Sequence, residues 1–186
     1  DCLNDIYAAT AKNPMLTEEL RFMKAQCYED VNLDVALEEY KTIFMQDDQY
    51  SLPAAVRYMD LTEDPASILD IAEIIRADNP QLYIEGVRRY MEVAPIAALQ
   101  EKEGFINSLT SDKAKALKCA GLYGKARLQN EAGSGREAAK TYTDIYKTSA
   151  SDHFAPIGLD AAIVIYKELK MDKEAAEVEA LRKKAK

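Results

Sequence analysis

The sequence lacks tryptophan and is poor in the residues that interrupt helices, with seven glycines and six prolines among 186 residues. Alanine, leucine, glutamate and lysine are abundant, and these residues favour helix over strand. A hydrophobic content of 48% in a chain of this length is enough to bury a core, which argues against disorder. We therefore predict an all-α protein.

Long hydrophobic runs are also absent. No stretch approaches the roughly 18 apolar residues that cross a bilayer, and no signal-peptide core opens the chain. We expect no transmembrane segment in this chain, and a cytoplasmic location is favoured. Because the chain starts at Asp1 rather than methionine, the alternative is a protein exported or tethered to a membrane through a removed N-terminal segment.

Clusters of positive charge are scarce. The formal net charge is −8, and most lysines and arginines are interspersed with acids, so no basic stripe could neutralise a series of phosphates. The basic end "LRKKAK" (181–186) fits a helix C-terminus, where cations oppose the partial negative charge of the last carbonyls. Nucleic acid is therefore excluded from the expected partners.

Histidine and cysteine are too few for a metal site. His153 is the only histidine, and no cysteine or histidine lies near it at a ligand spacing. Cys27 and Cys119 lie within helical patterns and are predicted to be buried small apolar groups, and the odd number of cysteines argues against a disulfide framework. A lipid anchor on Cys2 is not favoured, because Asp1 precedes it. We expect no metal and no cofactor.

Two short motifs lack the residues that their chemistry needs. "DVNLD" (30–34) has the spacing that opens a calcium loop, but Val35 replaces the glycine of the sharp bend and Lys41 the bidentate glutamate. We interpret it as an interhelical turn with Asp34 as the N-cap. "GSGRE" (133–137) has no preceding strand and no following Lys–Ser/Thr pair, so it is interpreted as a turn in which glycine lets the backbone reverse. With no catalytic triad visible, we predict no catalytic residue.

Apolar residues recur at spacings of three and four along most of the chain, which is typical of helices that bury one face. Proline is common at the first position of a helix, so "TEDP" (62–65) and "DNP" (78–80) each indicate a helix start. The run from Ile68 to Ile75 has an apolar arc too wide for a surface helix, so we place it centrally. Eleven helices are predicted, at 3–11, 17–29, 33–44, 52–60, 65–77, 81–93, 96–109, 112–131, 138–146, 156–169 and 173–184.

Two stretches of the chain carry the same pattern. "ALEEYKTIF" (36–44) and "AAKTYTDIY" (138–146) place Ala, Tyr, Ile and an aromatic residue at matching positions. Their first members, Ala36 and Ala138, are 102 residues apart, which is three times 34. A 34-residue period in a helical chain is typical of a stack of helical hairpins.

On these residues the chain resembles the tetratricopeptide repeat family, whose unit is a 34-residue helical hairpin. The residues that match the family pattern are Leu20, Met23, Ala36 and Tyr40 in a first unit, Leu122, Ala126, Gly133, Ala138 and Tyr142 in a later one, and Leu159, Ala162, Tyr166 and Ala175 in the last. The resemblance implies a right-handed α-α superhelix of antiparallel hairpins forming one domain over 1–186. Its clearest units are about 17–48, 119–150 and 156–186, with degenerate repeats at 50–110.

The resemblance further implies a noncatalytic scaffold that binds a peptide or a partner helix in a concave groove, which the first helix of each hairpin lines. The positions carried over are Glu18, Arg21, Tyr28, Tyr123, Arg127, Asn130, Asp160 and Lys167. Tyr28 and Tyr123 are the best candidates, because exposed tyrosine offers much contact area at low entropic cost. Either could instead seal the packing between hairpins.

Two alternatives stay open. The chain could be a helical accessory domain of an enzyme, which a deep pocket with convergent ionisable groups would favour over a shallow open groove. It could also be a homo-oligomeric structural component that assembles through exposed terminal hairpins.

Overall fold

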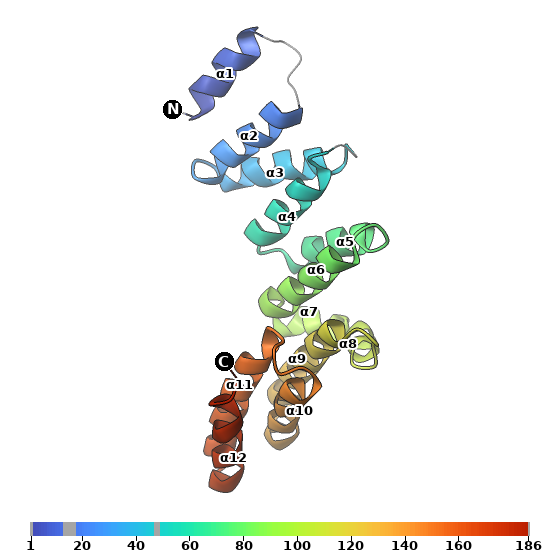
Figure 1. Ribbon diagram of the computed structural model, residues 1–186, viewed down its shortest axis with the longest axis vertical. Helices are drawn as coiled ribbons and strands as arrows, with labels where there is room; N and C mark the ends of the chain where they lie inside the picture. Colours follow the sequence, from blue (N-terminus) through green and yellow to red (C-terminus); the bar gives the residue numbers. More distant parts are fainter. Residues whose placement is uncertain (1, 13–17, 47–48, 186) are drawn as a thin grey trace. The chain divides into compact units, whose positions relative to one another are not determined.

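The computed structural model describes residues 2–12, 18–46 and 49–185. Within these ranges it consists of twelve α-helices without a strand, so the all-α prediction is confirmed (Figure 1). One helix more than predicted is present, because the segment 96–109 is broken at Lys102, whose φ of −104° and ψ of 19° lie outside the helical region. No helix in the described ranges has the length and apolar content that spanning a membrane requires.

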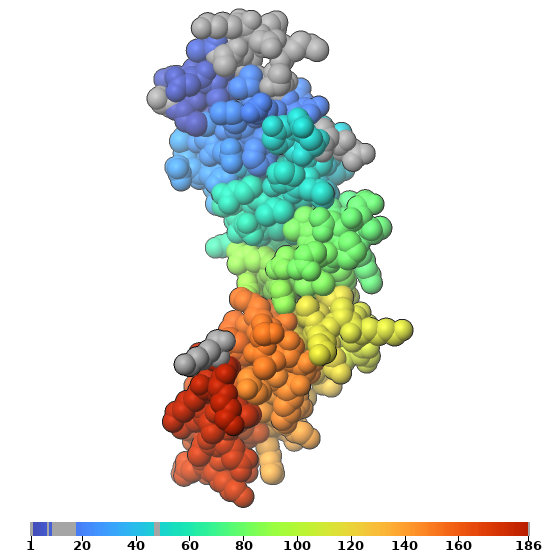
Figure 2. Space-filling view, viewed as in Figure 1, coloured from blue at the N-terminus to red at the C-terminus, as the bar shows by residue number. Residues whose placement is uncertain are grey.

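The contacts divide the chain into two compact units. Unit 1 is Asp1–Leu82 and unit 2 is Tyr83–Lys186; in Figure 2 the first runs from blue to green and the second from green to red. Within each unit, helices pack mainly on their neighbours in the sequence. A single repeat domain over 1–186 and its superhelical path stay predictions.

Unit 1 is a series of short helices in which each packs on the next. Its helices are α1 (Cys2–Lys12), α2 (Glu18–Glu29), α3 (Leu33–Phe44), α4 (Ser51–Leu61) and α5 (Pro65–Ile75). The buried face of α3 includes Ala36, Tyr40 and Ile43, which are almost fully buried and recur at spacings of three and four. This is the helical period on which the prediction for this segment rested.

Side-chain caps fix where two of these helices begin. Asn32 Oδ1 accepts a hydrogen bond from the Val35 N–H at 3.3 Å, so Asn32 is the N-cap of α3 and the prediction of Asp34 was wrong. Asp34 lies in the first turn instead. Asp64 caps α5 ahead of Pro65; the hydroxyl of Ser67 donates to Asp64 at 2.5 Å and is the main reason that the pKa of this carboxyl is lowered.

Unit 2 contains the longer helices, of which α9 to α12 lie side by side in sequence order (Figure 1). The helices from the boundary onward are α6 (Pro80–Val93), α7 (Ile96–Glu101), α8 (Glu103–Leu109), α9 (Lys115–Glu131), α10 (Gly135–Thr148), α11 (Phe154–Glu168) and α12 (Asp172–Arg182).

Left-handed residues reverse the chain at two of the turns. Gly133 between α9 and α10 has φ 77°, as the glycine-rich turn predicted, and the next N–H, of Ser134, donates to the Gln129 carbonyl at 2.9 Å. Lys170 has φ 57° between α11 and α12, followed by the same type of bond from Met171 to Tyr166 at 2.8 Å. Only one of these two equivalent turns contains a glycine in the left-handed position, so glycine in the sequence predicts the turn at Gly133 and not the turn at Lys170.

Small residues allow close helix crossings. Ala36 and Ala138, which begin the two matching stretches, are both fully buried. At Gly158 of α11, an added Cβ would lie 2.9 Å from the carbonyl oxygen of Tyr142 in α10, so the α10–α11 crossing leaves no room for a side chain. Burial of Ala36 and Ala138 is what the repeat register requires, although the register itself stays a prediction.

The run from Ile68 to Ile75 was predicted to lie in the interior, and this was wrong for Ile74. Ile68, Ile71 and Ile75 are buried in unit 1, whereas Ile74 is 60% exposed. The apolar arc of α5 is indeed wider than its neighbours can cover. The uncovered part is an exposed apolar surface.

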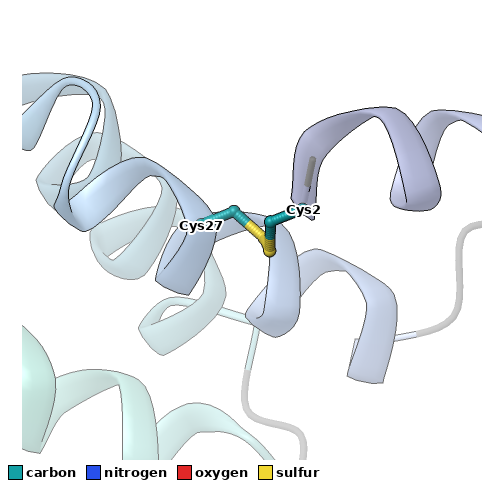
Figure 3. Close-up of a disulfide and its surroundings, with 2 residues drawn as sticks. All are labelled: Cys2 and Cys27. Atoms are coloured by element: carbon teal, nitrogen blue, oxygen red, sulfur yellow. A yellow bond between two sulfur atoms is a disulfide. The ribbon is translucent and has the colours of Figure 1, made fainter.

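The predicted burial of Cys119 is confirmed, whereas the expectation that the cysteines form no disulfide was wrong. Cys2, at the start of α1, forms a disulfide with Cys27, in the last turn of α2, and their Cα atoms are 5.8 Å apart (Figure 3). Because the bond joins the start of one helix to the end of the next, α1 and α2 run antiparallel. Cys119 is a fully buried thiol. Spacing could not reveal the pair, because geometry and not sequence separation decides which cysteines can bond.

We expect Ile71→Ala to lose about 2–5 kcal/mol of unfolding free energy, because it removes a buried side chain and leaves a cavity. Ile74→Ala is the matched control on the same helix and should change stability by less than about 0.5 kcal/mol. Urea unfolding measures both. Equal midpoints for the two variants would contradict the orientation of α5.

Digestion without reductant should yield Cys2 and Cys27 in one linked product. Breaking this link should cost about 3–4 kcal/mol, because it closes a loop of 25 residues. Native alkylation should leave Cys119 unmodified, because burial raises the pKa of its thiol to about 12 and keeps it neutral. Uptake of label at Cys2 and Cys27 before reduction, read by mass spectrometry, would contradict the disulfide.

Candidate interaction surface

Exposed apolar side chains of unit 1 gather where the ends of α3, α4 and α5 meet. Successive antiparallel helices bring the end of α3, the start of α4 and the end of α5 to the same place. Met45, Leu52 and Ile74 lie there with 70%, 40% and 60% of their surface exposed. Singly exposed apolar residues are ordinary, but a group contributed by three helices is a distinct surface feature.

These side chains line a hollow of about 460 Å³, which we call the α3–α5 hollow. Its lining residues are Phe44, Met45, Ser51, Leu52, Ile74, Ile75 and Asp78. Asp78 is the ionisable group in this lining. Covering Met45, Leu52 and Ile74 would gain roughly 1–2 kcal/mol for each side chain, at the usual free energy per area of apolar surface removed from water.

An acidic surface lies along the same helix. Asp34, Val35, Glu38, Glu39 and Thr42 of α3 line a second hollow of about 480 Å³. Steps of four and seven residues bring Asp34, Glu38 and Met45 onto one face of the helix, and we call these three residues the α3 stripe. Glu39 pairs with Lys24 at 2.6 Å, whereas Asp34 and Glu38 have no ion-pair partner among the described residues. The stripe thus leads from two carboxylates, past the exposed Lys41 on the same face, to the apolar hollow.

Glu29 is a polar junction between three helices of unit 1. It accepts hydrogen bonds from the hydroxyl of Tyr40 in α3 and from the guanidinium of Arg57 in α4, whose Nε lies 3.0 Å from Oε1. Burial raises the pKa of Glu29, but the bonds from Arg57 and Tyr40 outweigh it and the pKa is lowered overall. Burial and the Glu29 carboxylate both raise the pKa of Tyr40. These groups join helices and are already occupied.

Unit 2 has its own internal ion pair. Arg88 of α6 donates to Asp152 at 2.7 Å, and the Asp152 side chain is only 3% exposed. Asp152 also accepts from the Phe154 N–H at 3.0 Å, where α11 begins. This buried pair therefore fixes the start of α11 and presents no reactive group to solvent.

The groove residues predicted in unit 1 all lie on α2. Glu18 is exposed in the first turn, and Arg21 donates to the Gln46 side chain at 3.0 Å. Tyr28 is partly exposed, with the ammonium nitrogen of Lys24 5.7 Å from the centre of its ring. Tyr28 is thus accessible to a partner, with the Lys24 ammonium next to its ring.

Two of the predicted residues on α9 make contacts inside unit 2. Tyr123 stacks on Phe154 with ring centres 4.3 Å apart and meets Tyr142 edge to face, so it takes part in the packing between hairpins. Arg127 donates to the Met91 carbonyl of α6 at 2.7 Å. Asn130, near the end of α9, is exposed.

The predicted pair on α11 is engaged with the next helix. Asp160 bonds Arg182 at 2.7 Å and 3.1 Å, and Lys167 pairs with Glu179 at 2.6 Å. Both contacts join α11 to α12 at the surface, where ion pairs contribute little stability. The eight predicted residues are therefore divided between the units: three lie on α2, three on α9 and two on α11.

Unit 2 also has hollows with polar linings. One of about 360 Å³ is lined by residues of α7, α8, α9 and the turn between α9 and α10, with Glu103 and Lys125 as its ionisable groups and Ser134 as its hydroxyl. No cluster of three metal-binding side chains occurs in the part of the chain that the structure describes.

Comparison with protein-family models, curated proteins and solved structures gives no match to this chain. The tetratricopeptide resemblance therefore rests on the residues of the chain itself.

The sequence-based search missed the apolar residues of the α3–α5 hollow. The predicted site consists of tyrosine, charged and amide residues at repeat positions and does not include Met45, Leu52 or Ile74. One signal was present: the apolar arc of α5 was too wide for one neighbour. An excess of apolar surface on a helix can be buried or left for a partner, and sequence does not separate the two.

Glu29→Gln should lower the free energy of unfolding by about 1–3 kcal/mol at pH 7, because charged hydrogen bonds to Tyr40 and Arg57 are weakened. Since folding lowers the pKa of Glu29, this contribution is complete above the ordinary carboxyl pKa and disappears as the pH falls through the lowered value. The difference between wild type and variant should shrink between about pH 5 and pH 2.

Glu63→Gln, at an exposed position, is the control and should change stability by under about 0.5 kcal/mol. Urea titrations across this pH range give the comparison. A deficit in Glu29→Gln that is the same at every pH would assign the loss to packing rather than to the carboxylate.

Proposed function

We propose that this chain is a noncatalytic scaffold that binds another protein or a peptide. The observation that carries the proposal is the α3–α5 hollow, where three helices present apolar side chains to solvent. Such a surface matches the way in which helical partners and extended peptides dock, with apolar anchors entering a shallow groove. The sequence resemblance to tetratricopeptide repeats supports the same class of function.

The residues carried over from the repeat family belong to the proposal as a wider contact surface. Glu18, Tyr28 and Asn130 are accessible and suit contact with a partner. Tyr123 and Arg127 bond to other helices of unit 2, so substitutions there would change packing together with binding. The right-handed superhelix and its concave groove are part of this proposal.

We favour a scaffold over an accessory domain of an enzyme because several ionisable side chains join helices to one another. Glu29, Arg57, Arg88 and Asp152 are held in bonds between helices. These are structural uses of charge. The α3–α5 hollow opens at the surface between neighbouring helices.

The compartment in which the scaffold works is part of the proposal. Disulfides persist in oxidising compartments and are rare in the cytosol. The Cys2–Cys27 bond therefore supports the exported alternative over the cytoplasmic location that the sequence alone favoured.

The test is affinity capture from native extract with quantitative mass spectrometry, using wild type, Ile74→Asn and Val164→Asn. Ile74→Asn should reduce the main captured partner at least about tenfold, because it removes an apolar anchor at the centre of the hollow. Val164 is the control, since it is 54% exposed on α11 of unit 2, and its variant should capture as wild type does.

Both variants should keep the helicity and melting temperature of wild type, because both substitutions are at the surface. Absence of any partner specific to the wild-type chain, or turnover of a small molecule by the purified protein alone, would overturn the proposal.

A further inference from the structure

Charge is unevenly divided between the two units. Unit 1 contains 6 lysines and arginines against 17 aspartates and glutamates, which gives a net charge of −11. Unit 2 contains 18 against 15, which gives +3. The net charge of the chain, −8, therefore conceals a strongly acidic first unit. A field of this size attracts cations and speeds their association.

The acidic and the apolar surfaces of unit 1 meet on α3. Asp34 and Glu38 lie on the same face as Met45, which forms part of the α3–α5 hollow. Lys41 is the cation on that side of the helix, and it lies close enough to Asp64 to lower the pKa of that carboxyl. Lys41 lies seven residues after Asp34 and three after Glu38, on the same face, so this face carries two carboxylates and one ammonium and keeps an excess of negative charge.

We infer that the α3–α5 hollow and the α3 stripe together form a docking site for a cationic amphipathic segment of a partner protein. Its apolar side chains enter the hollow between Met45, Leu52 and Ile74. Its lysine or arginine side chains pair with Asp34 and Glu38. This inference rests on the proposed function and specifies the chemistry of the partner.

The spacing of the two surfaces sets the form of the ligand. Asp34 and Met45 are eleven residues apart, which is about 16 Å along the helix axis. A helical ligand lying along α3 therefore needs apolar anchors at one end and basic residues about three turns away. Asp78 in the lining of the hollow offers a further carboxylate at the apolar end.

The experiment uses the 186-residue chain and three synthetic, fluorescent helical peptides of about 18 residues. The first has leucines at one end and lysines about 16 Å away on the same face. The second replaces lysine with glutamate. The third scrambles the first without changing its composition. Binding is measured by fluorescence anisotropy at low and at high salt.

The first peptide should bind, and the second and third should bind at least about tenfold more weakly. Ile74→Asn should weaken the first peptide at least about tenfold. The double variant Asp34→Asn/Glu38→Gln should weaken it about 3–10-fold at low salt and remove most of its salt dependence. The matched control Glu131→Gln/Glu168→Gln, at exposed positions of unit 2, should bind as wild type does.

Equal binding of the lysine and glutamate peptides, or binding that Ile74→Asn does not change, would overturn the inference. Concentration-dependent self-association that Ile74→Asn abolishes would overturn it as well, since a second copy of the chain would then occupy the hollow. These results leave the proposed function intact if the extract still yields a partner that depends on Ile74. Failure of capture would instead remove the proposed function.

Discussion

The structure depends on the close packing of each helix on its neighbours in the sequence. Such packing needs a small residue where two backbones approach, as at Gly121 and Gly158. It also means that a helix has few neighbours to cover it, so any apolar residue outside those contact faces meets solvent. The exposed side chains around the α3–α5 hollow follow from this arrangement, because α5 has more apolar surface than its neighbours cover.

Much of the fold follows from local rules that sequence carries. The helical period of α3 and α10, the proline and aspartate that start α5 and the glycine that ends α9 predicted the elements correctly. Local rules did not predict the structure where two local structures fit the same sequence pattern. Asn32 and Asp34 can both cap a helix, Lys170 occupies a turn that usually takes glycine, and one helical pattern covers both α7 and α8. In these cases the surrounding contacts decide.

The candidate site was less predictable than the fold. Whether Ile74 is buried depends on which helices lie beside α5, and no local pattern contains that information. Tyr123 is of a residue type that is common at binding sites, yet its ring packs against Phe154 and Tyr142. Every charge is present in the sequence, but the division of charge between the units is not. It becomes visible only once the boundary near residue 82 is known.

The covalent link between Cys2 and Cys27 has a consequence for local unfolding. Among the described helices α1 packs chiefly on α2, and a helix held mainly by one neighbour opens more readily than one packed on both sides. The bond attaches α1 to the last turn of α2, so a fluctuation that breaks the packing of α1 leaves the helix tethered and able to return. Cleavage of the backbone between the two cysteines would likewise leave both pieces connected. The fold therefore keeps its first helix even when the contacts that normally hold it are open.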